Sequence, residues 1–141
     1  ADKLAKGNVK EIPGTRKFII KLKEYKLPLA IASAAQLSFI ELVLLELNLR
    51  DCFDVVASAE EVARGKPEPD LFLLAAKRLL VAPENCLVIE DGASGMIAAK
   101  RAGMQCVGLV KHTQTRSLPA DLLVEDLRDE RISETYEFTE T

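Results

Sequence analysis

This sequence of 141 residues lacks the features that mark membrane, secreted and nucleic-acid-binding proteins. No apolar run approaches the roughly 20 residues that a membrane-spanning helix needs. The first ten residues lack the hydrophobic segment of a secretory signal. The net charge of −3 has the wrong sign for a nucleic-acid-binding surface. We therefore expect a cytoplasmic protein that binds neither membranes nor nucleic acids.

Cysteine is also scarce. Cys52, Cys86 and Cys106 are odd in number and far apart, and two of them stand in apolar segments. A disulfide framework or a cysteine metal site would need paired or closely spaced residues. We interpret all three as small core residues of a protein from a reducing compartment.

The composition that remains is that of one globular domain. Hydrophobic residues make up 48% and charged residues 29% of the chain, which excludes a disordered protein. The acidic residues gather at the end, where residues 125–141 carry a net charge of −5 and leave +2 on residues 1–124. A mildly basic body suits an anionic small molecule, although a solvated acidic tail explains the asymmetry equally well.

Two apolar patterns alternate between residues 13 and 127. Periodicity typical of helices occurs at residues 15–26, 37–48, 69–80 and 94–102. Short continuous apolar runs, typical of buried strands, lie between them at 27–32, 53–58, 86–90 and 105–110, with a fifth candidate at 121–125. This alternation predicts an α/β fold of three layers, in which helices cover both faces of a Rossmann-like parallel sheet.

Adjacent acids follow one of the predicted strands. Glu90 and Asp91 end the apolar run CLVIE, and a turn of small residues leads from them into the next helix. Ionised acids are costly to bury without a partner, but they suit a divalent cation held over a phosphate. The alternative is structural: Asp91 caps the helix and Glu90 is exposed.

Two other strand ends carry polar groups. Ser33, followed by Ala34 and Ala35, offers a hydroxyl and free N–H groups that could cradle a phosphate, or it caps the helix that begins near Leu37. Lys66 lies in RGKPEPD, where two prolines stiffen the backbone. Such a lysine could neutralise phosphoryl oxygens or a carboxylate nucleophile, whereas the alternative is a solvated lysine on a turn.

Three segments together, LAIASAA, GKPEPDLF and VIEDGASGMIAAKRAGM, resemble the second, third and fourth motifs of the haloacid dehalogenase-like (HAD) hydrolase superfamily. The resemblance is nearest to the branch of β-phosphoglucomutase and small-metabolite phosphatases, and it covers residues 12–127. It implies that Ser33 and the Ala34 N–H bind the phosphoryl group and that Lys66 steadies phosphate and nucleophile. It further implies that Asp91 ligates Mg²⁺, with Glu90 as a second ligand or as a partner of one.

The activity that the resemblance implies is Mg²⁺-dependent removal of phosphate from a small metabolite, with a sugar phosphate as the expected class. A phosphomutase of the β-phosphoglucomutase type is the alternative. The residues after the serine argue against it, because Ala35, Gln36 and Leu37 replace the polar residues that such a mutase carries there.

The family's first motif is missing. Its DxD sequence ends the first strand and supplies the nucleophilic Asp and the acid/base Asp, but this chain contains no DxD. We therefore expect the chain as given to be inactive, either as part of a longer enzyme or as a catalytically dead module that binds Mg²⁺ and phosphate. On this interpretation residues 1–12 are a remnant of the cap or linker, residues 13–127 the HAD-like core and residues 128–141 an acidic tail.

The resemblance also implies a defect in the sheet. In this family the first strand lies centrally, between the strand that ends at Ser33 and the strand that ends at Asp91. Without it, both neighbours would present unpaired N–H and C=O groups. The two edges could then close on each other, or they could be filled by a second chain through self-association.

Overall fold

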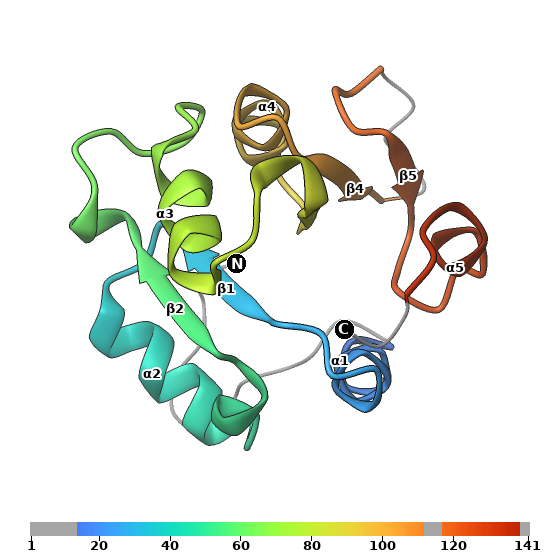
Figure 1. Cartoon of the computed structure of the whole chain (residues 1–141), viewed down its shortest axis with the longest axis horizontal. Coiled ribbons are helices and arrows are strands. Elements are labelled where there is room, and N and C mark those ends of the chain that lie inside the picture. Colours follow the sequence, from blue (N-terminus) through green and yellow to red (C-terminus); the bar gives the residue numbers. More distant parts are fainter. Residues whose placement is uncertain (1–13, 112–116, 139–141) are drawn as a thin grey trace.

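The computed structural model describes residues 14–111 and 117–138 of the chain, so the expected remnant at residues 1–12 lies outside it. Helices and strands alternate as the apolar pattern predicts (Figure 1). In order they are α1 (Thr15–Glu24), β1 (Ala30–Ser33), α2 (Leu37–Glu46), β2 (Val55–Ser58), α3 (Asp70–Leu79), β3 (Leu87–Glu90), α4 (Ala93–Arg101), β4 (Gln105–Leu109), β5 (Leu122–Val124) and α5 (Arg131–Thr135). Three 3-10 turns add η1 (Arg50–Cys52), η2 (Ala59–Glu61) and η3 (Pro83–Asn85).

The strands form two parallel sheets. β1 pairs with β2 in a register that sets Ser33 opposite Ser58, and β4 lies between β3 and β5 in the second sheet. This confirms the predicted parallel α/β architecture. Within the described ranges no pairing joins β1 to β3, so these two edges do not close on each other. That arrangement agrees with a sheet that lacks its central strand.

The hydrogen bonds of β1 show which of its backbone groups lie on the edge that faces away from β2. The Leu29 carbonyl accepts from the Val55 N–H of the neighbouring strand. Because peptide groups alternate in direction along a strand, the N–H and C=O groups of Ala30 and Ala32 are directed away from β2. They belong to the edge of β1 that no described strand covers.

The same alternation applies to β3. The Cys86 carbonyl accepts from the Gln105 N–H at the start of β4. The peptide groups of Leu87 and Ile89 are therefore directed away from β4, toward the uncovered side. All four residues of β3 are only partly buried, as are all four of β1, although strands of a parallel sheet are normally buried on both faces.

Helices cover both faces of the strands. On one face, Phe72 of α3 and Met96 of α4 belong to a core cluster against which Val88 packs. On the other face, Ile19 of α1 and Ile40 of α2 lie in a cluster that includes Ile31 and Val56 as partly buried members. The expected three-layer arrangement is thus present, with α3 and α4 in one layer and α1 and α2 in the other (Figure 1).

The segment beyond residue 127, expected to be an acidic tail, also contains packed structure. Ile132 of α5 is fully buried and clusters with Val107 and Val124 of the second sheet. The ring of Phe138 meets that of Phe18 of α1 edge to face, with centroids 6.0 Å apart. No helix in the part of the chain that the structure describes is long and apolar enough to cross a membrane.

Candidate functional site

Lys66 contacts the carboxyl ends of β1 and β3, which belong to different sheets. Its Nζ is 2.9 Å from Oε2 of Glu90 in β3 and 3.4 Å from the carbonyl oxygen of Ala32 in β1. The side chain is only 15% exposed, so Lys66 is not the solvated turn lysine of the alternative interpretation. Ala32 directly precedes Ser33 and Glu90 directly precedes Asp91, so one ammonium group contacts both neighbouring strand ends.

The backbone around Lys66 is fixed by short-range contacts. The Gly65 carbonyl accepts from the Glu68 N–H at 3.0 Å, which closes a turn around the lysine. Arg64 makes two hydrogen bonds to Asp70 in the first turn of α3, at 3.0 and 3.3 Å. From that helix the ring of Phe72 faces Nζ, with the centroid 5.0 Å away, a distance at which a cation and an aromatic ring attract. These contacts aim the ammonium group.

Both oxygens of Glu90 are occupied. Oε2 receives the Lys66 ammonium, and Oε1 accepts from the N–H groups of Asp91 and Gly92, at 3.2 and 3.3 Å. The carboxylate lies against Gly95, where an added Cβ would be 2.0 Å from the Glu90 Cδ. The resemblance leaves Glu90 as a second metal ligand or as a partner of the ligand Asp91. This geometry favours the partner, because Oε1 accepts the Asp91 N–H while Oε2 holds the Lys66 ammonium.

Asp91 differs from its neighbour. Its side chain is exposed and accepts no hydrogen bond from any residue that the structure describes. It does not cap α4 either, because the N-cap is Gly92 and the helix has no side-chain cap. The described ranges hold no group of three metal-ligating side chains. Asp91 therefore offers a single open carboxylate, which fits Mg²⁺ because that ion takes one or two carboxylates besides water and phosphate oxygens.

Ser33 does not cap the following helix. Its Oγ accepts from the Ala35 N–H at 3.1 Å, whereas the N-cap of α2 is Gln36, which makes no side-chain cap bond. Because Oγ is an acceptor in this contact, the hydroxyl proton remains free to be donated. The next residue, Ala34, is exposed, and its N–H has no acceptor in the described part of the chain. Both donors named from the sequence are thus available to a ligand.

Two residues that support the loop after Ser33 were not identified from the sequence. The Ser58 hydroxyl donates to the Ala35 carbonyl at 2.6 Å, and Glu60 Oε1 accepts from the Leu37 N–H at 2.8 Å. A signal was present, because Ser58 and Glu61 have the spacing of a capping box, which the structure contains. That pattern predicts a local turn, but it does not predict contacts with a loop more than 20 residues earlier.

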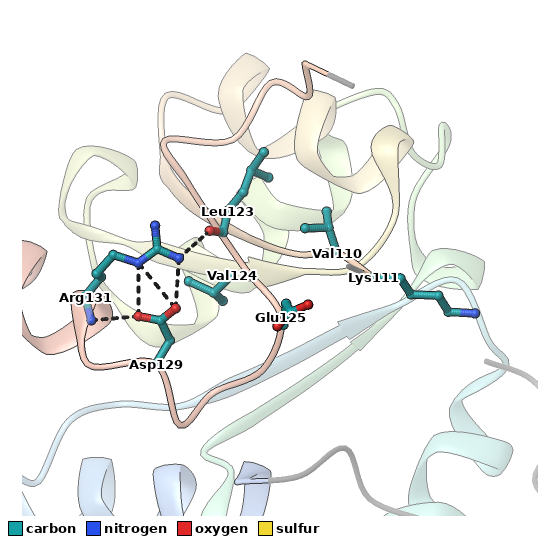
Figure 2. Close-up of a pocket in the computed structure, with 7 residues that line it drawn as sticks. All are labelled: Val110, Lys111, Leu123, Val124, Glu125, Asp129 and Arg131. Atoms are coloured by element: carbon teal, nitrogen blue, oxygen red, sulfur yellow. Dashed lines mark hydrogen bonds and ion pairs between the residues drawn. The ribbon is translucent and has the colours of Figure 1, made fainter. Parts of the chain in front are cut away.

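A shallow hollow of about 260 Å³ lies apart from these residues, at the ends of β4 and β5 (Figure 2). Arg131 borders it, with its guanidinium bound to Asp129 and to the Leu123 carbonyl. This ion pair, through its hydrogen bonds, holds the pKa of Asp129 below its usual value. No residue singled out from the sequence lines the hollow, so it does not contribute to the candidate site.

Comparison with known proteins agrees with the resemblance. A family model of haloacid dehalogenase-like hydrolases matches residues 1–103. Hexitol phosphatase B of Escherichia coli is 42% identical over 96 residues, which are 68% of this chain and 43% of that protein. The β-phosphoglucomutase of Bacillus subtilis is 33% identical over 134 residues, which are 88% of this chain and 58% of that protein.

A solved structure agrees as well. The β-phosphoglucomutase of Clostridium difficile superposes with a TM-score of 0.79 and 32% identity, covering 96% of this chain and 59% of that one. The chain thus spans about half the length of the proteins it matches. The family model, the relatives and the superposition lead to one conclusion: this chain belongs to the haloacid dehalogenase-like hydrolases, in the branch of phosphatases and β-phosphoglucomutases.

Proposed function

We propose that the chain is the phosphate- and metal-binding part of a Mg²⁺-dependent phosphatase that acts on a small phosphorylated metabolite. The observation that carries this proposal is the position of Lys66. Its ammonium contacts Ala32 and Glu90, the residues just before Ser33 and Asp91. A positive charge is therefore fixed beside the two strand ends that carry a hydroxyl donor and an open carboxylate, and a phosphoryl group with its metal ion requires these three kinds of group.

Each residue has a distinct part in this proposal. The Ser33 hydroxyl and the Ala34 N–H donate to phosphoryl oxygens, and the Lys66 ammonium offsets the negative charge there. Glu90 holds the ammonium in place through its 2.9 Å contact. Because the lysine is largely shielded from water, its attraction for the phosphoryl group is weakened less by solvent than that of an exposed lysine.

Asp91 would hold the metal ion. When bound, Mg²⁺ supplies positive charge that stabilises the phosphoryl oxygens. Asp91 is suited to this role because its carboxylate is exposed and accepts no hydrogen bond from the described residues. Glu90 would contribute by orienting the turn, since its Oε1 accepts the Asp91 and Gly92 N–H groups.

The favoured substrate class is a sugar phosphate. The similarity to hexitol phosphatase supports it. The second candidate, a phosphomutase, is supported by the similarity to two β-phosphoglucomutases. The loop after Ser33 weakens the case for the mutase, because Ala35 and Leu37 carry no polar group and leave Gln36 as the one polar side chain of residues 34–37.

Catalysis needs a nucleophile that this chain does not contain. The sequence holds no DxD motif, and the aspartyl-phosphate route requires the first Asp of that motif. The chain alone is therefore inactive, and turnover belongs to a longer protein whose central strand carries the motif. A binding module that never turns over substrate is the alternative.

Binding of inorganic phosphate tests the proposed phosphate and metal site directly. The 141-residue chain should bind phosphate in the presence of Mg²⁺, and Asp91→Ala should abolish the dependence on Mg²⁺. Asp51→Ala removes an exposed acid on η1 and should leave binding unchanged. Equal binding by Asp91→Ala and the unmodified chain would refute the metal assignment.

Turnover separates the enzyme from the binding module. Phosphate release from hexitol and hexose phosphates should be absent with the chain alone. It should appear, and depend on Mg²⁺, in a version extended at its N-terminus by a strand ending in DxD. Release by the 141-residue chain would contradict the missing nucleophile, and an inactive extended protein would favour the binding module.

A further inference from the structure

Ser58 is the single polar residue that is fully buried in the described part of the chain. A buried hydroxyl is destabilising unless it is hydrogen-bonded, so its partners indicate what it does. Ser58 Oγ donates to the Ala35 carbonyl at 2.6 Å and accepts from the Glu60 N–H at 3.3 Å. Ser58 stands opposite Ser33 in the β1–β2 register, at the end of the adjacent strand. Its hydroxyl thus secures the loop that follows Ser33.

Glu60 makes a second contact with the same loop. Its Oε1 accepts the Leu37 N–H at 2.8 Å, in the first turn of α2, where Gln36 supplies no side-chain cap. The two contacts bind Ala35 and Leu37, which follow Ala34 in the loop. The backbone of residues 34–37 is therefore secured on its carbonyl side by Ser58 and on its N–H side by Glu60.

The supporting segment is itself anchored. Glu61 accepts the Ser58 N–H at 2.9 Å and two hydrogen bonds from Arg78 of α3, at 2.8 and 3.2 Å. The Arg78 hydrogen bonds, followed by that of Ser58, lower the pKa of Glu61. Residues 58–61 are therefore tied to α3, the helix whose Phe72 faces Lys66.

We propose that Ser58 and Glu60 are positioning residues that hold the loop of residues 33–37 in its phosphate-binding form. The inference rests on the proposed function, because the loop's ligand is the phosphoryl group. Neither residue touches that ligand; both act through the backbone on which the Ser33 hydroxyl and the Ala34 N–H are mounted. A displaced donor no longer forms a well-aligned hydrogen bond to the ligand, so phosphate binding weakens.

The charge of Glu60 separates positioning from direct binding. A carboxylate near an anion site opposes phosphate binding, so Glu60 helps only through the hydrogen bond it accepts. Gln presents the same acceptor oxygen without the charge. Glu60→Gln should therefore bind phosphate at least as well as the unmodified chain, whereas Glu60→Ala should bind it about tenfold more weakly.

The experiment measures binding of inorganic phosphate with Mg²⁺, together with hydrogen exchange of the Leu37 amide in the free protein. Ser58→Ala and Glu60→Ala should weaken phosphate binding about tenfold, and Glu60→Ala should speed Leu37 exchange. Glu84→Ala, an exposed acid of η3, serves as the control. Because Glu60 is exposed, its variants should fold even if Ser58→Ala does not.

Each outcome decides one of the two proposals. Unchanged phosphate affinity in Glu60→Ala, with binding by the unmodified chain, would overturn the positioning role. The positioning role would also be overturned if Glu60→Gln bound phosphate as weakly as Glu60→Ala, because Gln keeps the acceptor oxygen. Failure of the unmodified chain to bind phosphate would refute the proposed function instead. Leu37 exchange would then decide the positioning role, with unchanged exchange in Glu60→Ala overturning it.

Discussion

At the scale of single residues, the site depends on a position without a side chain. Gly95 lies in α4, where glycine is a poor helix former, yet the Glu90 carboxylate occupies the space that a Cβ would need. The absence of one methyl group thus lets the partner of Lys66 fold back over the helix. Glycine at this position is therefore explained by the space that the Glu90 carboxylate needs and not by the helix.

Gly95→Ala tests this dependence. Alanine in a helix interior is favoured over glycine by about 1 kcal/mol, so a neutral site would become more stable. We expect a net loss of about 1–3 kcal/mol in the free energy of unfolding, because the Glu90 carboxylate is displaced and Lys66 loses its partner. Urea unfolding measures it. The control is Gly65→Ala, where a Cβ meets nothing within 4 Å, and an equal effect in both variants would contradict the explanation.

A second residue-scale feature concerns the end of α3. Leu80 adopts φ 61°, a left-handed conformation, and the residue is 91% exposed. The corresponding place after α4 holds Gly103 with φ 79°. Leu80→Gly should therefore raise the free energy of unfolding by about 1 kcal/mol. Asn48→Gly, at φ 57°, should gain less because asparagine tolerates this conformation. Thermal and urea unfolding would report the difference, and a loss in Leu80→Gly would contradict it.

At the scale of elements, the acid just before β5 adds side-chain contacts to the pairing of β5 with β4. The Asp121 carboxylate accepts the Cys106 N–H at 2.7 Å and the Lys100 ammonium at 2.8 Å. The Asp121 N–H in turn donates to the Cys106 carbonyl. Burial alone would raise the pKa of Asp121, but the hydrogen bonds from Lys100 and Cys106 outweigh it and lower the pKa.

This lowered pKa sets the direction of a pH dependence. A carboxyl with a lower pKa in the folded state stabilises the fold fully above its ordinary value of 3.8, and the contribution is lost as the pH falls through the folded pKa. Asp121→Asn should cost about 1 kcal/mol at pH 7, since it loses the charge pair but keeps an acceptor. The difference from the unmodified chain should shrink below about pH 4. A difference that is constant from pH 7 to pH 3 would contradict the assignment.

Most elements could be predicted from the apolar pattern because each has a periodicity that its packing requires. The helix at Arg131–Thr135 could not, since it spans a little over one turn and buries a single large residue, Ile132. Ser33 and Asp91 were identifiable because each follows an apolar strand directly, and Lys66 because two prolines stiffen its turn, although β2 ends well before it, at Ser58. Ser58 and Glu60 were not, because their function depends on which loop the strand register places beside them.

At the scale of the whole molecule, the family resemblance implies a missing strand, but it does not predict how the remaining strands arrange themselves. The structure keeps β1 and β3 in separate parallel sheets, each with a partner on one side only within the described ranges. Helix α1 contributes Ile19 to the core of the first sheet and Phe18 to that of the second. Packing of α1 against both sheets therefore holds them together where no strand pairing does.

Uncovered edges of this kind promote association between chains. We expect the 141-residue chain to self-associate with increasing concentration, as measured by sedimentation velocity. Ala30→Pro should reduce it, because proline removes an N–H on the uncovered side of β1 without touching the β2 pairing. Ile31→Pro should instead destabilise the fold, since that N–H faces β2. A chain that stays monomeric and unfolds in one cooperative transition would contradict the expectation.

The contact between Lys66 and the Ala32 carbonyl has a consequence for how the site is completed. That carbonyl faces the side of β1 where a new strand would pair, so an entering strand would claim it with its own N–H. The N–H of that strand would then compete with the ammonium for the Ala32 carbonyl, while the contact between the ammonium and Glu90 would remain. Insertion of a strand beside β1 would therefore weaken one of the two contacts that hold the ammonium, and the lysine would be freer to neutralise charge in the completed site.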